Sequence, residues 1–231
     1  MQDGALLPKA VVDLATGNGA GRAASPKRIR FTQTGRMRSG PNGRWMGFRA
    51  EQTIALDRCS FSWSARMGPF GVVQVEDSLD GGRGCLRVKA LGVVPLMRAP
   101  AGKELDRGEL MRYLAELAWA PDAILLNRTL RWETPSERCF VVSAGPADNT
   151  ASVTLECDVA GHVVAVAASD RPMFANGQYR ATPWFGRFFQ YEHHAGYRLP
   201  FRAEVGWQID GEHIVCWEAR LLEWTAERNS D

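Results

Sequence analysis

Short segments with the alternating pattern of β-strands follow one another along most of the chain, and this pattern restricts the fold more than any other feature. In 28–38 the even positions are polar and the odd ones largely apolar, as a strand with one buried face requires. Turn-forming residues separate the segments, for example at 80–82, 158–161 and 210–211. The predicted strands are 28–38, 44–56, 59–67, 72–79, 84–94, 129–134, 138–144, 151–158, 162–168, 186–194, 198–209 and 213–224. This spacing predicts a mainly β fold, with one strongly curved antiparallel sheet that forms a barrel or a half-barrel.

One segment in the middle of the chain has the pattern of a helix instead. Asp106 followed by Glu109 has the spacing of a capping box, with Asp106 at the N-cap. Apolar residues then recur at the spacing of one helix face, at Leu110, Tyr113, Leu114 and Leu117. We predict a main helix over 106–118 and a short helical turn at 123–126. A curved sheet has an apolar concave face, and these helices are expected to cover it.

Length and composition suit a single domain. The 231 residues are enough for one large domain, and 45% of them are hydrophobic, which can supply a sizeable core. We expect one β-barrel-like domain over 27–225, with a helical insert at 106–126. Residues 1–26 are rich in glycine and alanine, and they are expected to be flexible or short-helical.

The charge of the chain argues against a dedicated nucleic-acid partner. The formal net charge is only +2, whereas such domains are usually strongly basic. Arginines and lysines do gather between Asp13 and Glu51, where there is no acid. They form either a patch for phosphate or an anionic lipid head group, or the solvated face of a strand. The alternation within 28–38 favours the solvated face.

Several classes of site and location are not indicated by any motif. The five cysteines form no C-x-x-C pair, so neither a disulfide framework nor a zinc site is predicted, and no cofactor is expected. No serine or cysteine lies in a recognisable nucleophile motif. No stretch reaches the roughly 20 apolar residues of a membrane span, and the N-terminus lacks the features of an export signal. A cytoplasmic location is therefore expected.

Three carboxylates are candidates for chemistry. Glu51 lies among aromatic and apolar residues of 44–52, and Asp77 interrupts an apolar strand face. Glu116 lies beside the apolar face of the predicted helix, one turn from Arg112. These carboxylates could form an acid–base group with raised pKa values in an apolar cavity. Alternatively, each could be held by an arginine: Arg49, Arg66 or Arg98 for the strand residues, and Arg112 for Glu116.

Aromatic residues are the candidates for binding an apolar ligand. Eight tryptophans are many for this length, and they cannot all fill a core without partners for their N–H groups. Some are expected to line a cavity, although covering the sheet is an equal alternative. Alternation cannot tell which face of 44–56 is concave, that of Trp45 or that of Phe48. The candidate ligand-binding residues are Trp45, Phe48, Trp63, Tyr113, Trp119 and Trp132.

Two resemblances support this outline. The segments 44–52 (RWMGFRAEQ), 61–66 (FSWSAR), 113–121 (YLAELAWAP) and 131–133 (RWE) resemble an uncharacterised family of bacterial proteins that is frequent in actinomycetes. This resemblance runs in order from about Arg28 to Trp224. Residues 189–201 look like the strand–Gly–strand–Pro step of lipoprotein-carrier half-barrels. The second resemblance implies that acyl chains are held between a curved antiparallel sheet and covering helices.

Three functions fit these observations. The first is binding of a hydrophobic small molecule, lipid-like or polyketide-like, between the sheet and its helix. The second is a cofactor-independent cyclase, isomerase or hydrolase that uses Glu51, Asp77 and Glu116 on a hydrophobic intermediate. The third is a structural or partner-binding domain with a solid interior. Ligand binding is favoured because no nucleophile or metal motif is present, and the oligomeric state is left open.

Overall fold

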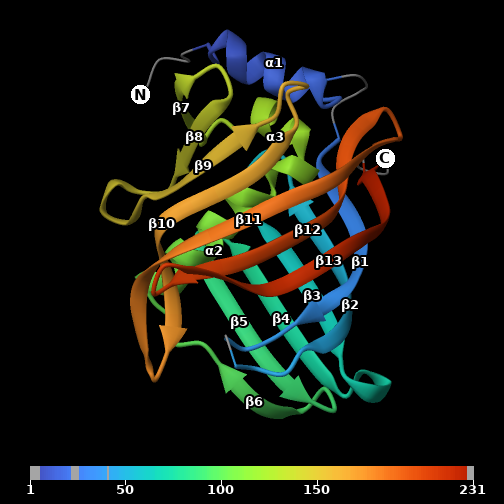
Figure 1. Ribbon diagram of the computed structural model, residues 1–231, viewed down its shortest axis with the longest axis vertical. Coiled ribbons are helices and arrows are strands. Elements are labelled where there is room, and N and C mark those ends of the chain that lie inside the picture. Colours follow the sequence, from blue (N-terminus) through green and yellow to red (C-terminus); the bar gives the residue numbers. More distant parts are fainter. Residues whose placement is uncertain (1–5, 22–25, 41, 228–231) are drawn as a thin grey trace.

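The computed structural model describes residues 6–21, 26–40 and 42–227. Its main feature is one antiparallel sheet of 13 strands in the order β6-β5-β4-β3-β2-β1-β13-β12-β11-β10-β9-β8-β7, curled around a set of helices (Figure 1). The strands are β1 Arg28–Met37, β2 Met46–Ala55, β3 Phe61–Met67, β4 Val73–Asp80, β5 Arg83–Ala90, β6 Val94–Arg98, β7 Arg131–Ser136, β8 Cys139–Ala144, β9 Ala151–Cys157, β10 Val163–Ala175, β11 Gln178–His194, β12 Tyr197–Ile209 and β13 Glu212–Glu227. The helices are α1 Lys9–Gly17, η1 Pro69–Gly71, α2 Lys103–Ala115, η2 Glu116–Trp119, α3 Pro121–Leu126 and η3 Ala147–Asn149.

The sheet consists of two halves that meet at a central seam. Strands β1 to β6 follow one another outward from the seam, and β7 to β13 follow one another back toward it. Strands β1 and β13, from opposite ends of the chain, form the seam and pair from Arg28↔Glu227 to Met37↔Trp217. The segment between the two halves, α2-η2-α3, lies within the curve of the sheet (Figure 1). The predicted mainly β, half-barrel fold covered by a helix is confirmed.

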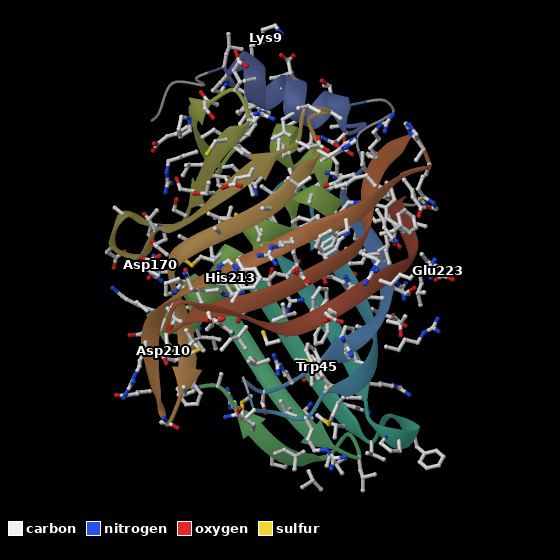
Figure 2. The ribbon with its side chains drawn as sticks, in the orientation of Figure 1. Lys9, Trp45, Asp170, Asp210, His213 and Glu223 are labelled. Carbon is white, nitrogen blue, oxygen red and sulfur yellow. The ribbon has the colours of Figure 1, made fainter. Side chains whose placement is uncertain are left out.

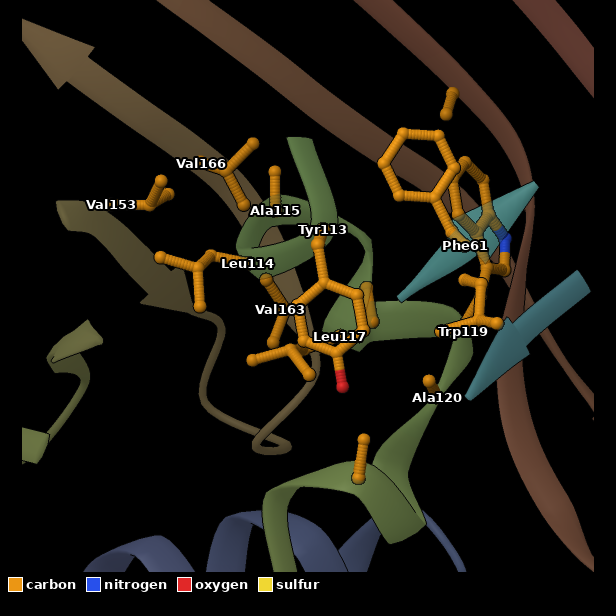
Figure 3. Close-up of a cluster of buried hydrophobic side chains, with 14 of the residues drawn as sticks. Phe61, Tyr113, Leu114, Ala115, Leu117, Trp119, Ala120, Val153, Val163 and Val166 are labelled. Atoms are coloured by element: carbon orange, nitrogen blue, oxygen red, sulfur yellow. The ribbon is translucent and has the colours of Figure 1, made fainter. Parts of the chain in front are cut away.

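Helix α2 fills the concave side because both halves of the sheet pack on it. It contacts β4 and β5 on one side, and β8, β9 and β10 on the other. Its residues are buried nearly all the way round, from Leu105 to Ala115. Close-packed side chains such as Tyr113, Leu114 and Val153 join it to the sheet (Figure 3). A helix enclosed in this way needs no polar outer face.

The start of α2 differs from the prediction. The helix begins at Lys103, and Asp106 lies inside its first turn rather than at the N-cap. The Asp106 carboxylate accepts a 2.7 Å hydrogen bond from the Gly84 backbone N–H of β5. Asp106 therefore ties the helix to the sheet, and Glu109 is freed from the predicted capping role.

Two strand boundaries also differ from the prediction. The predicted strand 84–94 ends early, at Ala90 of β5, because the chain turns at Leu91 and Gly92, both with positive φ, and β6 begins at Val94. Strands β10 and β11 extend beyond the predicted ranges to a hairpin turn at Asn176-Gly177, where φ is 52° and 80°. This dipeptide is a strong signal for a two-residue hairpin turn.

At one end of the half-barrel, α1 packs on the rest of the molecule (Figure 1). Its buried residues Val11, Leu14 and Ala15 join the main core. Polar side chains such as the labelled Glu223 and Asp210 surround the outside of the sheet (Figure 2). Within the described ranges, no helix is long and apolar enough to cross a membrane.

Candidate functional site

A row of polar and aromatic side chains crosses the concave face of β2, β3 and β4. Gln52, Trp63 and Asp77 are direct neighbours in the register of these three strands. All three are at least nine-tenths buried. Polar groups buried in this way need partners, and Arg112 of α2 and Glu116 at the start of η2 supply several of them.

Arg112 on α2 is the centre of this buried polar cluster. Its guanidinium contacts the Asp77 carboxylate, donates a 2.9 Å hydrogen bond to Glu116, and lies 4.8 Å from the centre of the Phe61 ring. Gln52 donates a hydrogen bond to the other oxygen of Glu116. Burial lowers the pKa of Arg112, but the carboxylates of Glu116, Asp77 and Glu109 outweigh it and raise that pKa. The cluster therefore has a permanent positive charge at its centre.

Glu109 lies one turn before Arg112 and differs from the other acids of the cluster. It is buried, and its Oε2 atom has no hydrogen-bond partner among the described residues, and neither does Asp77 Oδ1. Burial, together with the nearby Asp77 carboxylate, raises the pKa of Glu109 well above its usual range. A proton on Glu109 would therefore serve both carboxyl groups. Burial also raises the pKa of Glu116, although Arg112 opposes this effect.

An apolar cavity lies beside the cluster. Its volume is about 200 Å³, and four tryptophans form much of its wall. The lining residues are Met37, Trp63, Val75, Asp77, Leu86, Arg112, Ala115, Glu116, Trp119, Val166, Arg171, Trp184, Gly186, Phe188, Val205 and Trp217. Mostly apolar walls with a few polar groups are typical of small-molecule sites.

A second hollow adjoins this cavity. It has a volume of about 500 Å³ and is formed mainly by α2, β10, β12 and β13. Leu86 and Arg171 line both spaces, so these two residues lie at the boundary between them. The volume of this second hollow falls in the range of about 300–1,000 Å³ that is usual for ligand sites. The polar cluster adjoins both, because Glu109 lines the second hollow.

A β-bulge directs Arg171 into the interior. The register between β10 and β11 shifts between Ala168 and Arg171, where Ala168 opposes Trp184 and Arg171 opposes Thr182. The preceding residue, Asp170, is half-exposed, and Arg107 of α2 binds its carboxylate at 2.6 Å and its backbone carbonyl at 2.9 Å. Bulges re-aim side chains in this way. Sequence alternation alone could not reveal the position of Arg171, and neither it nor Glu109 was a predicted site residue.

The three predicted acids do not lie together. Asp77 and Glu116 meet at Arg112, as described above, and this i, i+4 pair of Glu116 with Arg112 is buried rather than on the surface. Glu51 is on the opposite face of β2, where its side chain is 64% exposed and pairs with Arg30 at 2.9 Å. The expectation that Glu51 lies in an apolar setting is therefore wrong, because its side of the strand is the convex one.

The candidate ligand-binding residues also divide between locations. Trp63 and Trp119 line the cavity, and Phe48 packs against Trp63 and Trp217, two of its wall residues. Tyr113 is in the solid core, where its hydroxyl donates a hydrogen bond to the Ala55 carbonyl oxygen.

Trp132 and Trp45 lie away from the two interior spaces. Trp132 is partly buried on β7, at the far edge of the sheet. The Trp45 ring is contacted by the guanidinium groups of Arg36 and Arg38, at 4.7 and 4.8 Å from its centre. The sequence did not predict that residues 184–188 of β11 line the cavity, although Trp184, Gly186 and Phe188 alternate along this segment.

The basic segment near the N-terminus forms cross-strand ion pairs on the outer face of the sheet. Arg28 pairs with Glu227, and Arg36 pairs with Glu218, in each case with the residue directly opposite. Strand β13 thus supplies acids that the local sequence lacks. This arrangement favours the solvated strand face over an anion-binding patch.

A curved sheet, an enclosed helix and an apolar cavity together define the class of this protein: a half-barrel with a cavity between its sheet and its helix. The chain belongs to the family of unknown function DUF6544, which matches residues 1–219. A search among curated proteins gives no match.

Two solved structures show the same fold. A DUF1329 family protein from Desulfovibrio piger has a TM-score of 0.53 and 8% sequence identity, with 96% of this chain and 94% of that chain covered. A LolA superfamily protein from Nitrosomonas europaea has a TM-score of 0.50 and 10% identity, with 98% and 96% covered. These likenesses span whole chains and concern the fold alone.

Proposed function

We propose that this protein binds a hydrophobic small molecule, lipid-like or polyketide-like, between the curved sheet and helix α2. The observation that carries the proposal is the apolar cavity of about 200 Å³ with four tryptophans in its wall, which adjoins a larger hollow at Leu86 and Arg171. A well-packed interior has few voids larger than a water molecule. A space of this size beside a buried polar cluster is therefore better explained by a ligand than by folding.

The buried carboxyl groups also bear on the alternative of an acid–base enzyme. Asp77 and Glu116 both contact Arg112, and such contacts are typical of a buried structural ion-pair cluster. Glu51 is on the opposite, convex face of β2, so it does not act together with them. These contacts favour binding over acid–base chemistry by the three predicted residues.

Filling the cavity tests the proposal. Val166 lines it and is 2% exposed, so Val166→Phe would occupy part of the space a ligand needs. We expect Val166→Phe to weaken binding of the neutral apolar dye N-phenyl-1-naphthylamine at least about tenfold, or 1.4 kcal/mol. The measurement is a fluorescence titration of the purified protein.

A matched substitution controls for added hydrophobic surface. Val159 lies in the β9–β10 turn and is 90% exposed, so Val159→Phe should bind the dye as the unmodified protein does. Ala115→Leu fills the same cavity from the helix side and guards against misfolding of the first variant. Equal dye binding by all four proteins would refute the proposal.

A further inference from the structure

Arg171 has an unusual position for a partly buried cation. Its guanidinium lies 4.6 Å from the ring centre of Trp184 and 5.7 Å from that of Trp207. These two tryptophans are direct cross-strand neighbours on β11 and β12, so they form one aromatic surface under the arginine. The side chain lines both interior spaces, at the boundary between them.

Arg171 lacks the polar partners that Arg112 has. Among the described residues it makes no hydrogen bond and no ion pair, and its Nε atom is buried without a partner. Of the acids around Arg171, Glu109 has the largest electrostatic effect on its pKa, but it forms no ion pair with Arg171. Burial and the Asp77 carboxylate favour the neutral form of Glu109. Aromatic faces attract a guanidinium but do not satisfy its N–H groups.

The electrostatic balance at this position also leaves room for a negative charge. Burial lowers the pKa of Arg171, and the positive charge of Arg112 acts in the same direction. Glu109 and Asp77 oppose these effects but do not cancel them. A partly buried cation in such surroundings is stabilised when an anion with matching hydrogen-bond geometry reaches it.

We propose that Arg171 binds the acidic head group, a carboxylate or a phosphate, of a ligand whose apolar part occupies the tryptophan-lined cavity. This inference rests on the proposed function and adds the chemical class of the ligand. The planar guanidinium has its donors arranged to suit either oxyanion. The head group would lie at the boundary of the two spaces, and the apolar chain would extend from there.

Three probes with the same chain test the inference: dodecanoic acid, dodecyl phosphate and 1-dodecanol. Each is titrated against protein loaded with N-phenyl-1-naphthylamine, whose neutral structure makes the readout independent of Arg171. We expect at least one anionic probe to displace the dye with an affinity about tenfold higher than that of the alcohol. The tighter anion identifies carboxylate or phosphate as the head group.

The preference for the anion must depend on Arg171. In Arg171→Gln it should disappear while binding of 1-dodecanol is retained, and Arg171→Lys should restore part of it. Arg180→Gln, an exposed change on the same β10–β11 hairpin, should keep the full preference.

Two results would count against the proposal in different ways. A preference that survives in Arg171→Gln, or is absent from the unmodified protein, overturns the role of Arg171 and leaves apolar binding standing. Failure of all three probes to displace the dye, or failure of the dye to bind, refutes the proposed function itself.

Discussion

At the scale of single residues, burial decides the charge of the interior. Arg112 pairs with Asp77 and Glu116, whereas Glu109 and Arg171 form no ion pair with any residue that the structure describes. Burial and the Asp77 carboxylate raise the pKa of Glu109 and so favour its neutral form, a response that is open to a carboxyl but not to an arginine. Arg171 keeps its charge and rests on two tryptophan faces. This difference makes Glu109 a source of pH dependence and Arg171 a binding residue.

Glu109→Gln should change how stability depends on pH. The pKa of Glu109 in the folded protein lies above the value of about 4.3 expected in the unfolded chain. Below about pH 4.3 the carboxyl is neutral in both states, and its full contribution to the stability of the fold is present. This contribution is lost as pH rises toward the folded pKa, at up to about 1.4 kcal/mol per pH unit for one proton. The glutamine side chain is neutral at every pH, so the variant should match the unmodified protein near pH 4 and be more stable near pH 8.

Urea unfolding across this pH range measures the effect. Glu223→Gln, on the exposed outer face of β13, is the matched control and should leave the pH profile unchanged. A Glu109→Gln protein that is less stable than the unmodified protein near pH 8 would contradict the account, because it would mean that Glu109 is ionised and paired.

At the scale of elements, the sequence predicts where the strands lie along the chain far better than it predicts which face of each strand points inward. Alternation and turn residues located the strands because both signals are local. Whether Glu51 or Gln52 points inward depends on the direction in which the whole sheet curves, which no single strand records. The bulge before Arg171 changes parity within one strand, and Asp106 leaves its predicted cap for a contact with β5. Such features depend on partners far along the chain.

The seam between β1 and β13 gives a prediction at this scale. A Cβ at Gly35 would lie 2.0 Å from the Glu218 backbone oxygen and 2.9 Å from the Ala219 Cα. Because backbone atoms cannot move aside cheaply, we expect Gly35→Ala to destabilise the fold by about 3 kcal/mol. Urea unfolding monitored by circular dichroism measures the loss.

Gly47 provides the control from the neighbouring strand. A Cβ there meets nothing closer than 3.8 Å, so Gly47→Ala should change stability by no more than about 0.5 kcal/mol. Equal losses of stability in Gly35→Ala and Gly47→Ala would show that β1 and β13 do not pair closely at the seam.

At the scale of the whole molecule, the curved sheet and its buried helix create an interior that is neither solid nor open. The two halves of the sheet pair at β1 and β13 and close around α2, and the cavity remains where the tryptophans of β3, β11 and β13 face the helix. Sequence predicted the helix as a cover, but the size and position of the space depend on how the halves come together.

The indole N–H signals of the eight tryptophans test the central claim most directly. We would titrate the protein with N-phenyl-1-naphthylamine, record nitrogen–proton spectra, and assign each signal with a Trp→Phe variant. The account predicts saturable shifts for the cavity-lining residues Trp63, Trp119, Trp184 and Trp217, with Trp45 and Trp132 unchanged. Shifts confined to Trp45 or Trp132, or no shift at any dye concentration, would contradict it.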